Sequence, residues 1–294
     1  HAVQAAGIKI QTASHVVDIA LASDGFRVSF IFNNNTHQRN FEKIIVSAGG
    51  KAYPTLGTKG DLYPIIANLG HTINPIKPAL APVLTELGDL KQLKGVRLDL
   101  GTALYQGTEQ IASTAGNMIF TEWGLNGPAV MNLSHHIPDP PGDSIALSLN
   151  LLHFIKDDFY ALLSQNHQKQ FPVSLLLSAF FPPKVVETYT NLAGVAKEKP
   201  LNQISDQSFN KLINTLKDTR LKVKGVRGYK YCQASTGGVP VHEVNPNSLE
   251  SRMHKGMHLT GEILDVVGPC GGYNLHFAFA SGVIAGRSAS KTKS

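Results

Sequence analysis

Hydrophobic and polar positions near the start of the chain alternate in the manner of β-strands. Three strands are expected, at residues 8–21, 26–32 and 43–47. Before the third, the polar run 33–36 contains three consecutive asparagines. Asparagine tolerates positive φ and bonds to its own backbone, so this run is typical of a hairpin turn. The pattern therefore predicts a β-meander that leads into strand 43–47.

The strand at 43–47 has the composition of a strand that is buried on both faces. Its centre is a run of three β-branched apolar residues, as in sheets covered on both sides. It stops at Ala48, Gly49 and Gly50, whose small size lets the backbone approach another group closely. A helix is expected within 61–70, because Asp61 suits its start and Gly70 its end.

A cluster of three prolines between residues 74 and 82 marks a change of structural unit. Short apolar stretches broken by glycine follow, and they predict strands at 96–100, 102–106, 110–114, 117–121 and 144–152. Their spacing is typical of a small antiparallel sheet or barrel. Strand character returns at 221–244, and we expect this segment to rejoin the same sheet.

The apolar period changes between these two sets of strands. Phe209, Leu212, Ile213 and Leu216 recur at i, i+3, i+4 and i+7, which predicts an amphipathic helix over 204–221. A similar pattern begins at Ile155. The sequence therefore predicts a helical region inserted between two parts of a β-sheet.

The stretch from 257 to 286 is the most informative part of the chain. It reads as a short strand ending at Gly261 and Glu262, then a turn containing Gly271 and Gly272, then a helix of small and apolar residues. This order directs free backbone N–H groups and the positive end of a helix dipole at one point, which suits an anionic or carbonyl-bearing ligand. No G-x-G-x-x-G fingerprint or P-loop occurs in the 294 residues, so the pattern predicts one half of a cofactor site.

Composition and charge restrict the class of protein. Two cysteines in 294 residues allow no disulfide framework and predict a reducing, cytoplasmic setting. No apolar run reaches the roughly 20 residues that cross a bilayer, so we expect no membrane partner. The twelve histidines show no metal-ligand spacing, and no metal is predicted. The opening residues from His1 read as the end of a helix, so we expect the chain to be a portion of a longer polypeptide.

A formal charge of +6 keeps a second class of function open. The basic residues between 217 and 230 could contact phosphates, which would make the chain a non-catalytic module that binds nucleic acid or protein. Apolar and aromatic residues alternate with them, so a strand with one solvated face explains the pattern equally well. We expect no nucleic-acid partner.

Four ordered segments resemble the YhiN/BaiN-like family of NAD(P)/FAD-dependent oxidoreductases, the aminoacetone-oxidase-type flavoproteins. They span 44–61, 117–134, 235–252 and 256–282, and the most specific is GEILD followed after five residues by GGYN. The resemblance implies a partial glutathione-reductase-like, Rossmann-like FAD-binding domain interrupted by a β-barrel with a helical subdomain. Together with the composition shifts it places the FAD domain at 1–75 and 255–294, the barrel at 76–150 and 221–254, and the helical subdomain at 151–220. The family's G-x-G-x-x-G segment would precede His1.

The resemblance also implies roles for particular residues. Glu262, after Gly261, would accept hydrogen bonds from the ribityl hydroxyls of FAD, since a carboxylate can accept two at once. Backbone N–H groups of Gly271, Gly272, Tyr273 and Asn274 would face the pyrimidine edge of the flavin. Ala48, Gly49 and Gly50 would run beside the cofactor.

These residues also have a plainer explanation, in which the glycines serve turn and helix packing and Glu262 is an exposed loop acid. The leading hypothesis is an FAD-dependent oxidoreductase, or the C-terminal portion of one, that passes a hydride from NAD(P)H through flavin to a small molecule. No catalytic proton donor, substrate or oligomeric state is predicted.

Overall fold

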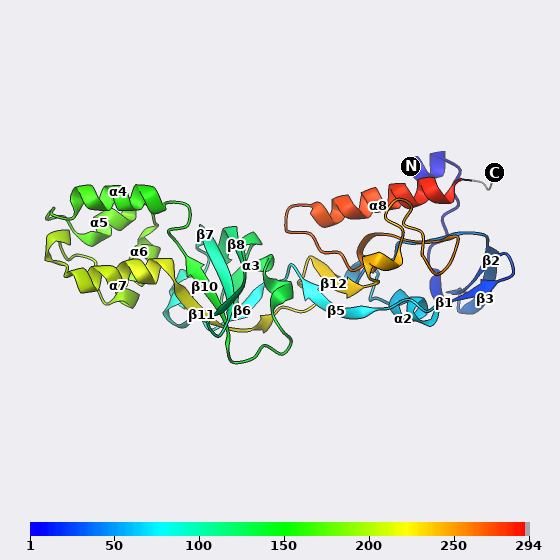
Figure 1. Cartoon of the computed structure of the whole chain (residues 1–294), viewed down its shortest axis with the longest axis horizontal. Helices are drawn as coiled ribbons and strands as arrows, with labels where there is room; N and C mark the ends of the chain where they lie inside the picture. Colours follow the sequence, from blue (N-terminus) through cyan, green and yellow to red (C-terminus); the bar gives the residue numbers. More distant parts are fainter. Residues whose placement is uncertain (292–294) are drawn as a thin grey trace. The chain divides into compact units, whose positions relative to one another are not determined.

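The computed structural model describes residues 1–291, which form two compact units. Unit 1 contains residues 1–77 and the chain from 234 onward, and unit 2 contains residues 78–233. Each unit combines strands and helices, so the expected mixed α/β class is confirmed (Figure 1). The first unit is thus assembled from two segments that are distant in the sequence.

Unit 1 begins with the short helix α1 (Ala2–Ala5), followed by a three-stranded antiparallel meander of β1 (His15–Ala22), β2 (Gly25–Phe32) and β3 (Asn35–Phe41). The predicted hairpin turn is confirmed, because Asn33 and Asn34 have φ of 49° and 60° between β2 and β3. The expected strand at 8–21 is wrong in its first half. Residues 8–14 carry no strand, and Ile8 and Ile10 are exposed, because no neighbouring strand pairs with them.

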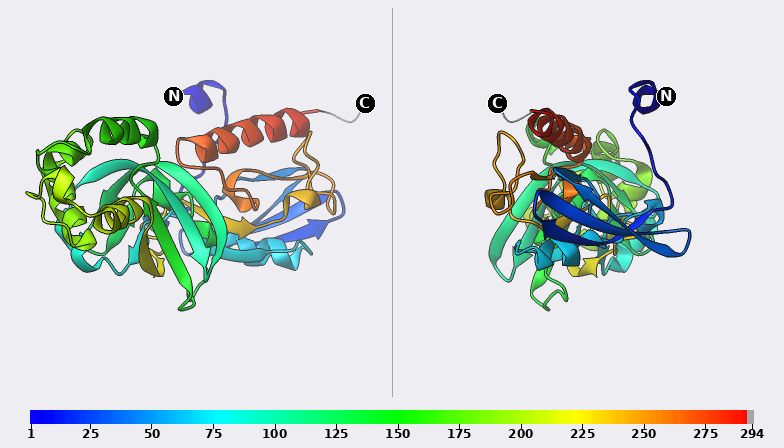
Figure 2. Two further views of the ribbon diagram at one scale, coloured as in Figure 1. Left: turned by 60° about the vertical axis from the view of Figure 1, so that its left-hand side comes forward. Right: turned by 90° about the vertical axis from the view of Figure 1, so that its right-hand side faces the viewer.

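The second part of unit 1 contains a parallel pair of strands that the sequence pattern did not predict. β4 (Ile44–Val46) pairs in parallel with β13 (Met257–Leu259), in register Ile44 to Met257. Helix α8 (Tyr273–Ala289) contacts both strands and lies along them (Figure 2), and α2 (Leu62–Asn68) follows β4. The expected burial of β4 on both faces is wrong for Ile45, which is 41% exposed. Among the described residues, β13 is the one strand that pairs with β4.

A second small sheet of unit 1 differs from the expected domain boundaries. β12 (Ala234–Gly238) pairs with β5 (Asn74–Ala79) and not with the barrel strands. Residues 234–254 therefore belong to unit 1, whereas the sequence pattern placed them with the barrel. Three 3-10 turns complete this unit: η1 (Pro54–Leu56), η5 (Val241–Glu243) and η6 (Gly261–Ile263).

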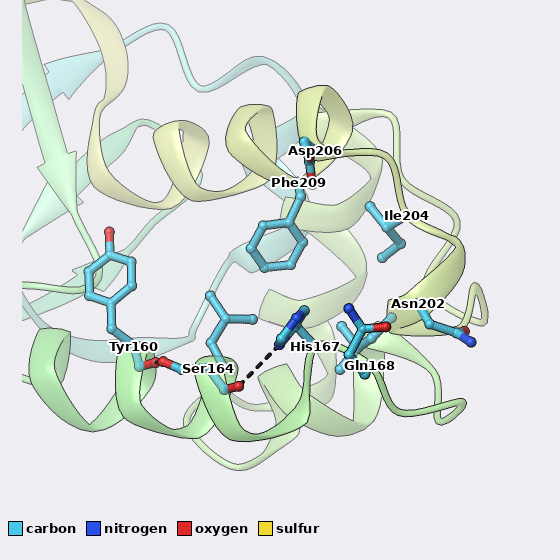
Figure 3. Close-up of a pocket in the computed structure, with 10 residues that line it drawn as sticks. Tyr160, Ser164, His167, Gln168, Asn202, Ile204, Asp206 and Phe209 are labelled. Atoms are coloured by element: carbon cyan, nitrogen blue, oxygen red, sulfur yellow. Dashed lines mark hydrogen bonds between the residues drawn. The ribbon is translucent and has the colours of Figure 1, made fainter.

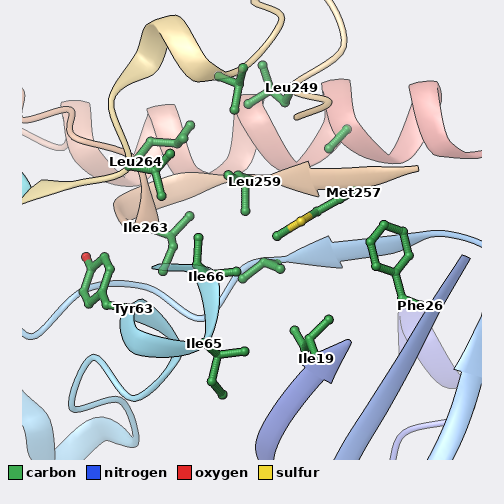
Figure 4. Packing of buried hydrophobic residues seen from close by; sticks show 14 residues of the cluster. Ile19, Phe26, Tyr63, Ile65, Ile66, Leu249, Met257, Leu259, Ile263 and Leu264 are labelled. Atoms are coloured by element: carbon green, nitrogen blue, oxygen red, sulfur yellow. The ribbon is translucent and has the colours of Figure 1, made fainter. Parts of the chain in front are cut away.

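The core of unit 1 draws on residues of β1, β2, β4, α2, β13, η6 and α8 (Figure 4). Met257, Leu259 and Ile263 are fully buried around β13 and meet Ile66 of α2. Phe26 of β2 closes the cluster at the meander side. Burying such side chains contributes about 1.5–3 kcal/mol each, so the core fixes the strand ends from which the candidate site is built.

Unit 2 contains a closed six-stranded barrel with strand order β10-β11-β6-β9-β8-β7. The strands are β6 (Val83–Thr85), β7 (Arg97–Gln106), β8 (Glu109–Phe120), β9 (Gly124–Asn126), β10 (Ile145–Asn150) and β11 (Thr219–Val226). The predicted barrel is thus present, with the short elements η2 (Gly88–Leu93), α3 (Pro128–Met131) and η3 (Ser134–His136) at its connections.

Two expected strand breaks in the barrel are wrong. Segments 96–100 and 102–106 form the single strand β7 apart from residue 96, and segments 110–114 and 117–121 form β8 apart from residue 121. Gly101 pairs with Ala115 inside the ladder, and a Cβ at Gly101 would lie 2.8 Å from His153 Nδ1. This glycine therefore permits a close approach and does not interrupt the strand.

Helices of unit 2 occupy the predicted helical region. They are α4 (Lys156–Asn166), α5 (Val173–Ser178), α6 (Pro183–Ala193) and α7 (Asp206–Lys217), with the 3-10 turn η4 (Leu201–Gln203) before α7. Ser205 caps α7, because its hydroxyl accepts the backbone N–H of Ser208. Helix α7 buries Leu212 and Leu216 as the period predicted, but it ends earlier, since Thr219 already belongs to β11. The further division of unit 2 into barrel and helical subdomain stays a prediction.

Candidate functional site at the carboxyl ends of two parallel strands

The predicted site residues of unit 1 follow the carboxyl ends of β4 and β13. Because the two strands are parallel, these ends lie at the same edge, where ligands of open α/β sheets bind. The backbone N–H of Thr260 bonds to Val46 O at 3.0 Å, which holds the two strand ends together. Ala48, Gly49 and Gly50 follow β4 directly, and Gly261 and Glu262 begin η6. The fold thus brings together two of the three predicted segments.

Glu262 anchors a clamp between three segments of unit 1. Its Oε1 accepts the backbone N–H of Ser235 at 2.7 Å and the Ser235 hydroxyl at 2.5 Å. Ser235 Oγ in turn accepts the backbone N–H of Lys51 at 3.0 Å. The chain after β4, the start of β12 and the turn η6 are therefore linked through one carboxylate oxygen.

Gly50 is held against this clamp. A Cβ at Gly50 would clash with Ser235 Oγ and Glu262 Oε1, and it would lie 2.8 Å from Glu262 Cδ. The sequence predicted that the backbone here approaches another group closely. At Gly50 that group is a pair of side chains of the protein itself, Ser235 and Glu262. Glycine is favoured at position 49 for a different reason, because the φ of 74° lies in the left-handed region.

The second oxygen of Glu262 is differently placed. Within residues 1–291, the hydrogen bonds of this carboxylate all go to Oε1, and Oε2 accepts none. Burial raises the pKa of the Glu262 carboxyl, and the two hydrogen bonds from Ser235 oppose this only in part. The tyrosine hydroxyl of Tyr63 donates to Glu262 O at 3.0 Å and fixes the backbone from the side of α2. The result is an immobilised, half-buried carboxylate with one uncommitted oxygen.

Helix α8 meets η6 through close backbone packing. Gly261 has φ of 68°, and its N–H donates to Ser281 Oγ at 3.0 Å. A Cβ at Gly261 would lie 3.6 Å from Ala278 Cβ, which is ordinary contact, so the positive φ is what favours glycine here. The middle of α8 is therefore fixed beside Glu262.

The predicted glycine turn directly precedes α8. Gly272 is the N-cap of the helix with φ of 91°, and Gly271 has φ of 126°. A Cβ at Gly272 would have nothing within 4 Å, so its backbone faces open space. Tyr273 is 61% exposed. The first N–H groups of a helix lack intrahelical acceptors, so this end of α8 has the donors that the prediction required.

The side chain of Asn274 has a structural partner. Its Nδ2 donates to Gly268 O at 3.0 Å, and its Oδ1 accepts Gly268 N–H at 2.8 Å. The amide thereby closes the loop that precedes α8. Only the backbone of Asn274, and not its side chain, stays available for the predicted contact.

Asp265 was not predicted as a site residue, although it belongs to the most specific segment. Its Oδ1 accepts Gly237 N–H at 2.8 Å, and its Oδ2 accepts Asn74 Nδ2 at 2.8 Å. It therefore connects η6 with β12 and β5. Its place at the end of the GEILD string, beside Glu262, is a signal that could have identified it.

Cavities of the two units lie at different places. In unit 1, a cavity of about 380 Å³ adjoins Ala48 and is lined on its other sides by Leu56, Thr58 and Asp61. In unit 2, a cavity of about 390 Å³ lies between α4, η4 and α7, where Phe209 and Tyr160 line it. Figure 3 shows His167 among the lining residues, with Nδ1 bonded to Ser164 O at 3.1 Å. Among the predicted site residues, Ala48 lines the first of these cavities.

Part of the positive charge of the basic segment 217–230 is paired with carboxylates. Lys222 pairs with Asp143 at 2.7 Å and Lys224 with Glu86 at 3.0 Å. The guanidinium of Arg227 lies over the ring of Tyr231, 3.3 Å from its centroid. These contacts account for the strand pattern without a phosphate ligand.

The described part of the chain contains neither a candidate metal site nor a candidate membrane span. Among residues 1–291, no group of three or more histidine, cysteine, aspartate or glutamate side chains could hold a metal ion. In the same residues, no helix has the length and apolar character to cross a bilayer.

Comparison with known proteins identifies the family. The family model described as HI0933-like protein Rossmann domain matches residues 1–288. The chain belongs to this family. The predicted YhiN/BaiN-like, Rossmann-like flavoprotein is therefore confirmed, and so is its assignment to the flavin-dependent oxidoreductases.

Three curated relatives of this HI0933-like chain are informative. It is 30% identical to a 3-dehydro-bile acid delta(4,6)-reductase of Clostridium scindens over 97% of the chain and 70% of the relative. It is 28% identical to a ribosomal RNA dihydrouridine synthase of Escherichia coli over 93% of the chain and 66% of the relative. The corresponding synthase of Haemophilus influenzae is 27% identical over 94% and 67%. The chain thus spans about two thirds of the length of these proteins.

Proposed function

We propose that this chain contributes the flavin-ring end of an FAD site, and that its protein transfers a hydride from NAD(P)H through FAD. The observation that carries the proposal is the state of Glu262. One carboxylate oxygen is fixed by Ser235 and the other accepts no hydrogen bond from the described residues, at the strand edge where ligands bind. An immobilised acceptor of this kind suits vicinal hydroxyls such as those of a ribityl chain.

Three segments would hold the cofactor in this proposal. Glu262 Oε2 would accept hydrogen bonds from the ribityl hydroxyls, while Oε1 keeps the clamp with Ser235. The backbone N–H groups of Gly271 to Asn274 would donate to the pyrimidine carbonyl edge and stabilise negative charge there, as the positive end of a helix does. Ala48, Gly49 and Gly50 would line the cofactor from the side of β4. Bound flavin supplies the hydride acceptor and donor that side chains lack.

The substrate class that we propose is a ring with an electron-poor carbon–carbon double bond. The names of the relatives support it, because a delta(4,6)-reductase and a dihydrouridine synthase both describe addition of hydrogen across such a bond. The two substrates differ greatly in size. The shared chemistry therefore supports the reaction type, while steroid-like and RNA substrates are both consistent with it.

FAD binding by Glu262→Gln tests the proposal. The amide carbonyl can still accept from Ser235, but an NH₂ group replaces Oε2 and cannot accept a hydrogen bond. We expect the Kd for FAD, measured by flavin fluorescence, to rise about 10-fold, equivalent to about 1.4 kcal/mol. Glu198→Gln, at an exposed glutamate of unit 2, is the matched control and should leave the Kd unchanged.

Three results would contradict the proposal or a part of it. A purified protein that gains no flavin absorbance after incubation with FAD would exclude the cofactor. An unchanged Kd in Glu262→Gln, with the protein still folded by circular dichroism, would exclude the role of Oε2. If the flavin-loaded protein oxidises neither NADPH nor NADH, the proposed nicotinamide donor is rejected.

The binding-module alternative stays a prediction, and the structure gives it little support. Lys222 and Lys224 already have carboxylate partners, so fewer cations remain for phosphates. Binding to a single-stranded RNA that weakens steeply as salt rises would favour it. Absence of binding at low salt would remove it.

A further inference from the structure

The loop 51–60, between the turn that follows β4 and helix α2, has both of its ends fixed beside the proposed flavin site. At its start, the backbone N–H of Lys51 donates to Ser235 Oγ, the hydroxyl that also bonds Glu262. At its return, Thr58 Oγ1 donates to the backbone oxygen of Gly50 at 3.0 Å. The loop therefore leaves and rejoins the protein at the same small segment.

The apex of this loop holds a large apolar side chain away from the core of unit 1. Leu56 is 84% exposed, although its backbone N–H bonds to Tyr53 O at 2.8 Å in the turn η1. Tyr53 has φ of 49° and ψ of 63°, a left-handed conformation that is unfavourable for residues other than glycine. Such backbone strain persists only where the surrounding structure fixes it. The exposed position of Leu56 is thus imposed by the loop.

Leu56 also lines the cavity of about 380 Å³ that adjoins Ala48, which we call the Leu56 cavity. Its apolar wall is extended by Val16 of β1 and Leu62 of α2. A volume of this size is in the range of small-molecule sites, which are mostly apolar with a few polar groups. Because Ala48 is also proposed to lie along the cofactor, the Leu56 cavity is continuous with the proposed flavin site.

The charge of the Leu56 cavity does not suit an anionic ligand. Asp61 is a carboxylate on its wall, and the lining residues that the structure describes include no lysine or arginine. Lys51 and Lys59 line a neighbouring cavity of about 690 Å³ instead. A phosphate in the Leu56 cavity would therefore meet a like charge without a cation to pair with.

We propose that the Leu56 cavity receives an uncharged, apolar ring of the substrate, and that Leu56 is the side chain that selects for it. The inference rests on the proposed function and narrows its substrate class to cyclic enones, in which a hydrocarbon ring carries a double bond conjugated to a ketone. Leu56 would cover one face of this ring and remove it from water, which is favourable for apolar surface. A nucleotide has neither the apolar surface nor the charge that this cavity suits.

The experiment follows the absorption of the bound flavin while probes are added to the FAD-loaded protein. Cyclohexenone and testosterone are uncharged rings with a conjugated ketone, and uridine monophosphate combines an electron-poor double bond with a phosphate. We expect at least one of the two enones to change the flavin spectrum saturably. Uridine monophosphate at the same concentrations should leave the spectrum unchanged.

Substitution of Leu56 tests its role in selecting the ring. We expect Leu56→Ala to raise the Kd of the bound enone about 10-fold, the lower end of the effect of lost apolar contacts in a pocket. Leu56→Met keeps the apolar contact and should retain most of the affinity. Leu175→Ala, at a leucine of α5 that is 59% exposed, is the matched control and should leave the Kd unchanged. The Kd for FAD and the midpoint of urea unfolding should be the same in all of these proteins.

Four results would overturn the proposal. They are a flavin spectrum that neither enone changes, equal or tighter binding of uridine monophosphate, an unchanged Kd for the enone in Leu56→Ala, and an altered sedimentation coefficient of Leu56→Ala, which would assign Leu56 to an interface between copies. The Kd for FAD, measured on the same samples, separates the two proposals. A protein that binds no FAD contradicts the proposed function, whereas normal FAD binding without an effect at Leu56 contradicts this inference alone.

Discussion

Substitution of Gly50 by alanine tests the clamp around Glu262. Gly50 needs no left-handed φ, so the effect of the new methyl group comes from its contacts alone. The Cβ would clash with Ser235 Oγ and Glu262 Oε1, and both atoms are fixed by hydrogen bonds. A side chain added to a closely packed place cannot be accommodated without movement.

The cost can be estimated from the two ways of relieving the clash. If the chain after β4 moves, overpacking costs about 1–3 kcal/mol. If the carboxylate moves, it gives up hydrogen bonds to a charged acceptor, which contribute about 1.5–3 kcal/mol. Either route lowers the free energy of unfolding, and we expect a loss of about 2–3 kcal/mol for Gly50→Ala.

Urea unfolding followed by circular dichroism measures this loss. Gly282→Ala is the matched control, because Gly282 lies inside α8 and a Cβ there has nothing within 4 Å. Alanine is favoured over glycine in a helix by about 1 kcal/mol, so the control should be slightly stabilised. A change below about 0.5 kcal/mol in Gly50→Ala would refute the reasoning, since surface substitutions fall in that range.

A double-mutant cycle identifies the atoms responsible. In a Glu262→Ala background the carboxylate is absent, so the cost of Gly50→Ala should fall by about 0.5–3 kcal/mol, as for residues in contact. Additive effects would mean that the methyl group clashes with Ser235 Oγ or another group, and not with the Glu262 carboxylate.

Three further predictions concern side chains that hold segments of unit 1 together. Asp265→Asn replaces one of two accepting oxygens by a donor, so we expect a loss of about 1–3 kcal/mol of unfolding free energy in urea. Asn274→Ala removes both bonds to Gly268, and we expect faster proteolysis of the loop before α8 with little change in the midpoint of urea unfolding. Burial raises the pKa of Glu243, but hydrogen bonds from Thr72 and His71 outweigh it and hold the pKa below its usual range. Its stabilisation is therefore complete above the unfolded pKa near 4.5 and lost as pH falls through the folded pKa, so Glu243→Gln should flatten the acid limb of a stability profile.

Each of these predictions has a control and a contrary result. Asp18→Asn, on an exposed face of β1, should leave stability unchanged, and an equally silent Asp265→Asn would remove its structural role. Unchanged cleavage in Asn274→Ala would show that the loop is held by other contacts. If Glu243→Gln loses stability with acid as steeply as the wild type, another carboxylate controls that limb.

The sequence alone predicted those elements that depend on interactions between residues close together in the chain. The consecutive asparagines located the hairpin turn, and the period of three to four residues located α7 with its buried Leu212 and Leu216. Glycine was less reliable as a marker. Gly101 lies within β7 because His153 needs the space beside it, whereas Gly7, with φ of 70°, lies in the turn after α1. A strand break and a close approach therefore have the same appearance in sequence.

Pairing between distant segments could not be predicted in this way. β12 was expected to join the barrel, since its composition fits either sheet equally well. In the structure it pairs with β5 and is held by Asp265, which comes 28 and 29 residues after the strand residues it bonds, Gly237 and Thr236. A side chain that is distant in sequence therefore helps to hold β12 in this sheet, and the apolar pattern contains no trace of that contact.

The candidate site illustrates the same distinction at one residue. A carboxylate after a strand and a glycine was enough to select Glu262 from the sequence. Its hydrogen bonds, however, come from Ser235, 27 residues earlier, and they occupy one of its two oxygens. If that oxygen were free, the side chain could rotate away from a ligand, and ordering it would reduce the binding free energy by up to about 2 kcal/mol of lost side-chain freedom. The clamp removes that cost before any ligand arrives, which is a reason to place the accepting role on Oε2 and to expect Ser235→Ala to weaken FAD binding without touching the cofactor.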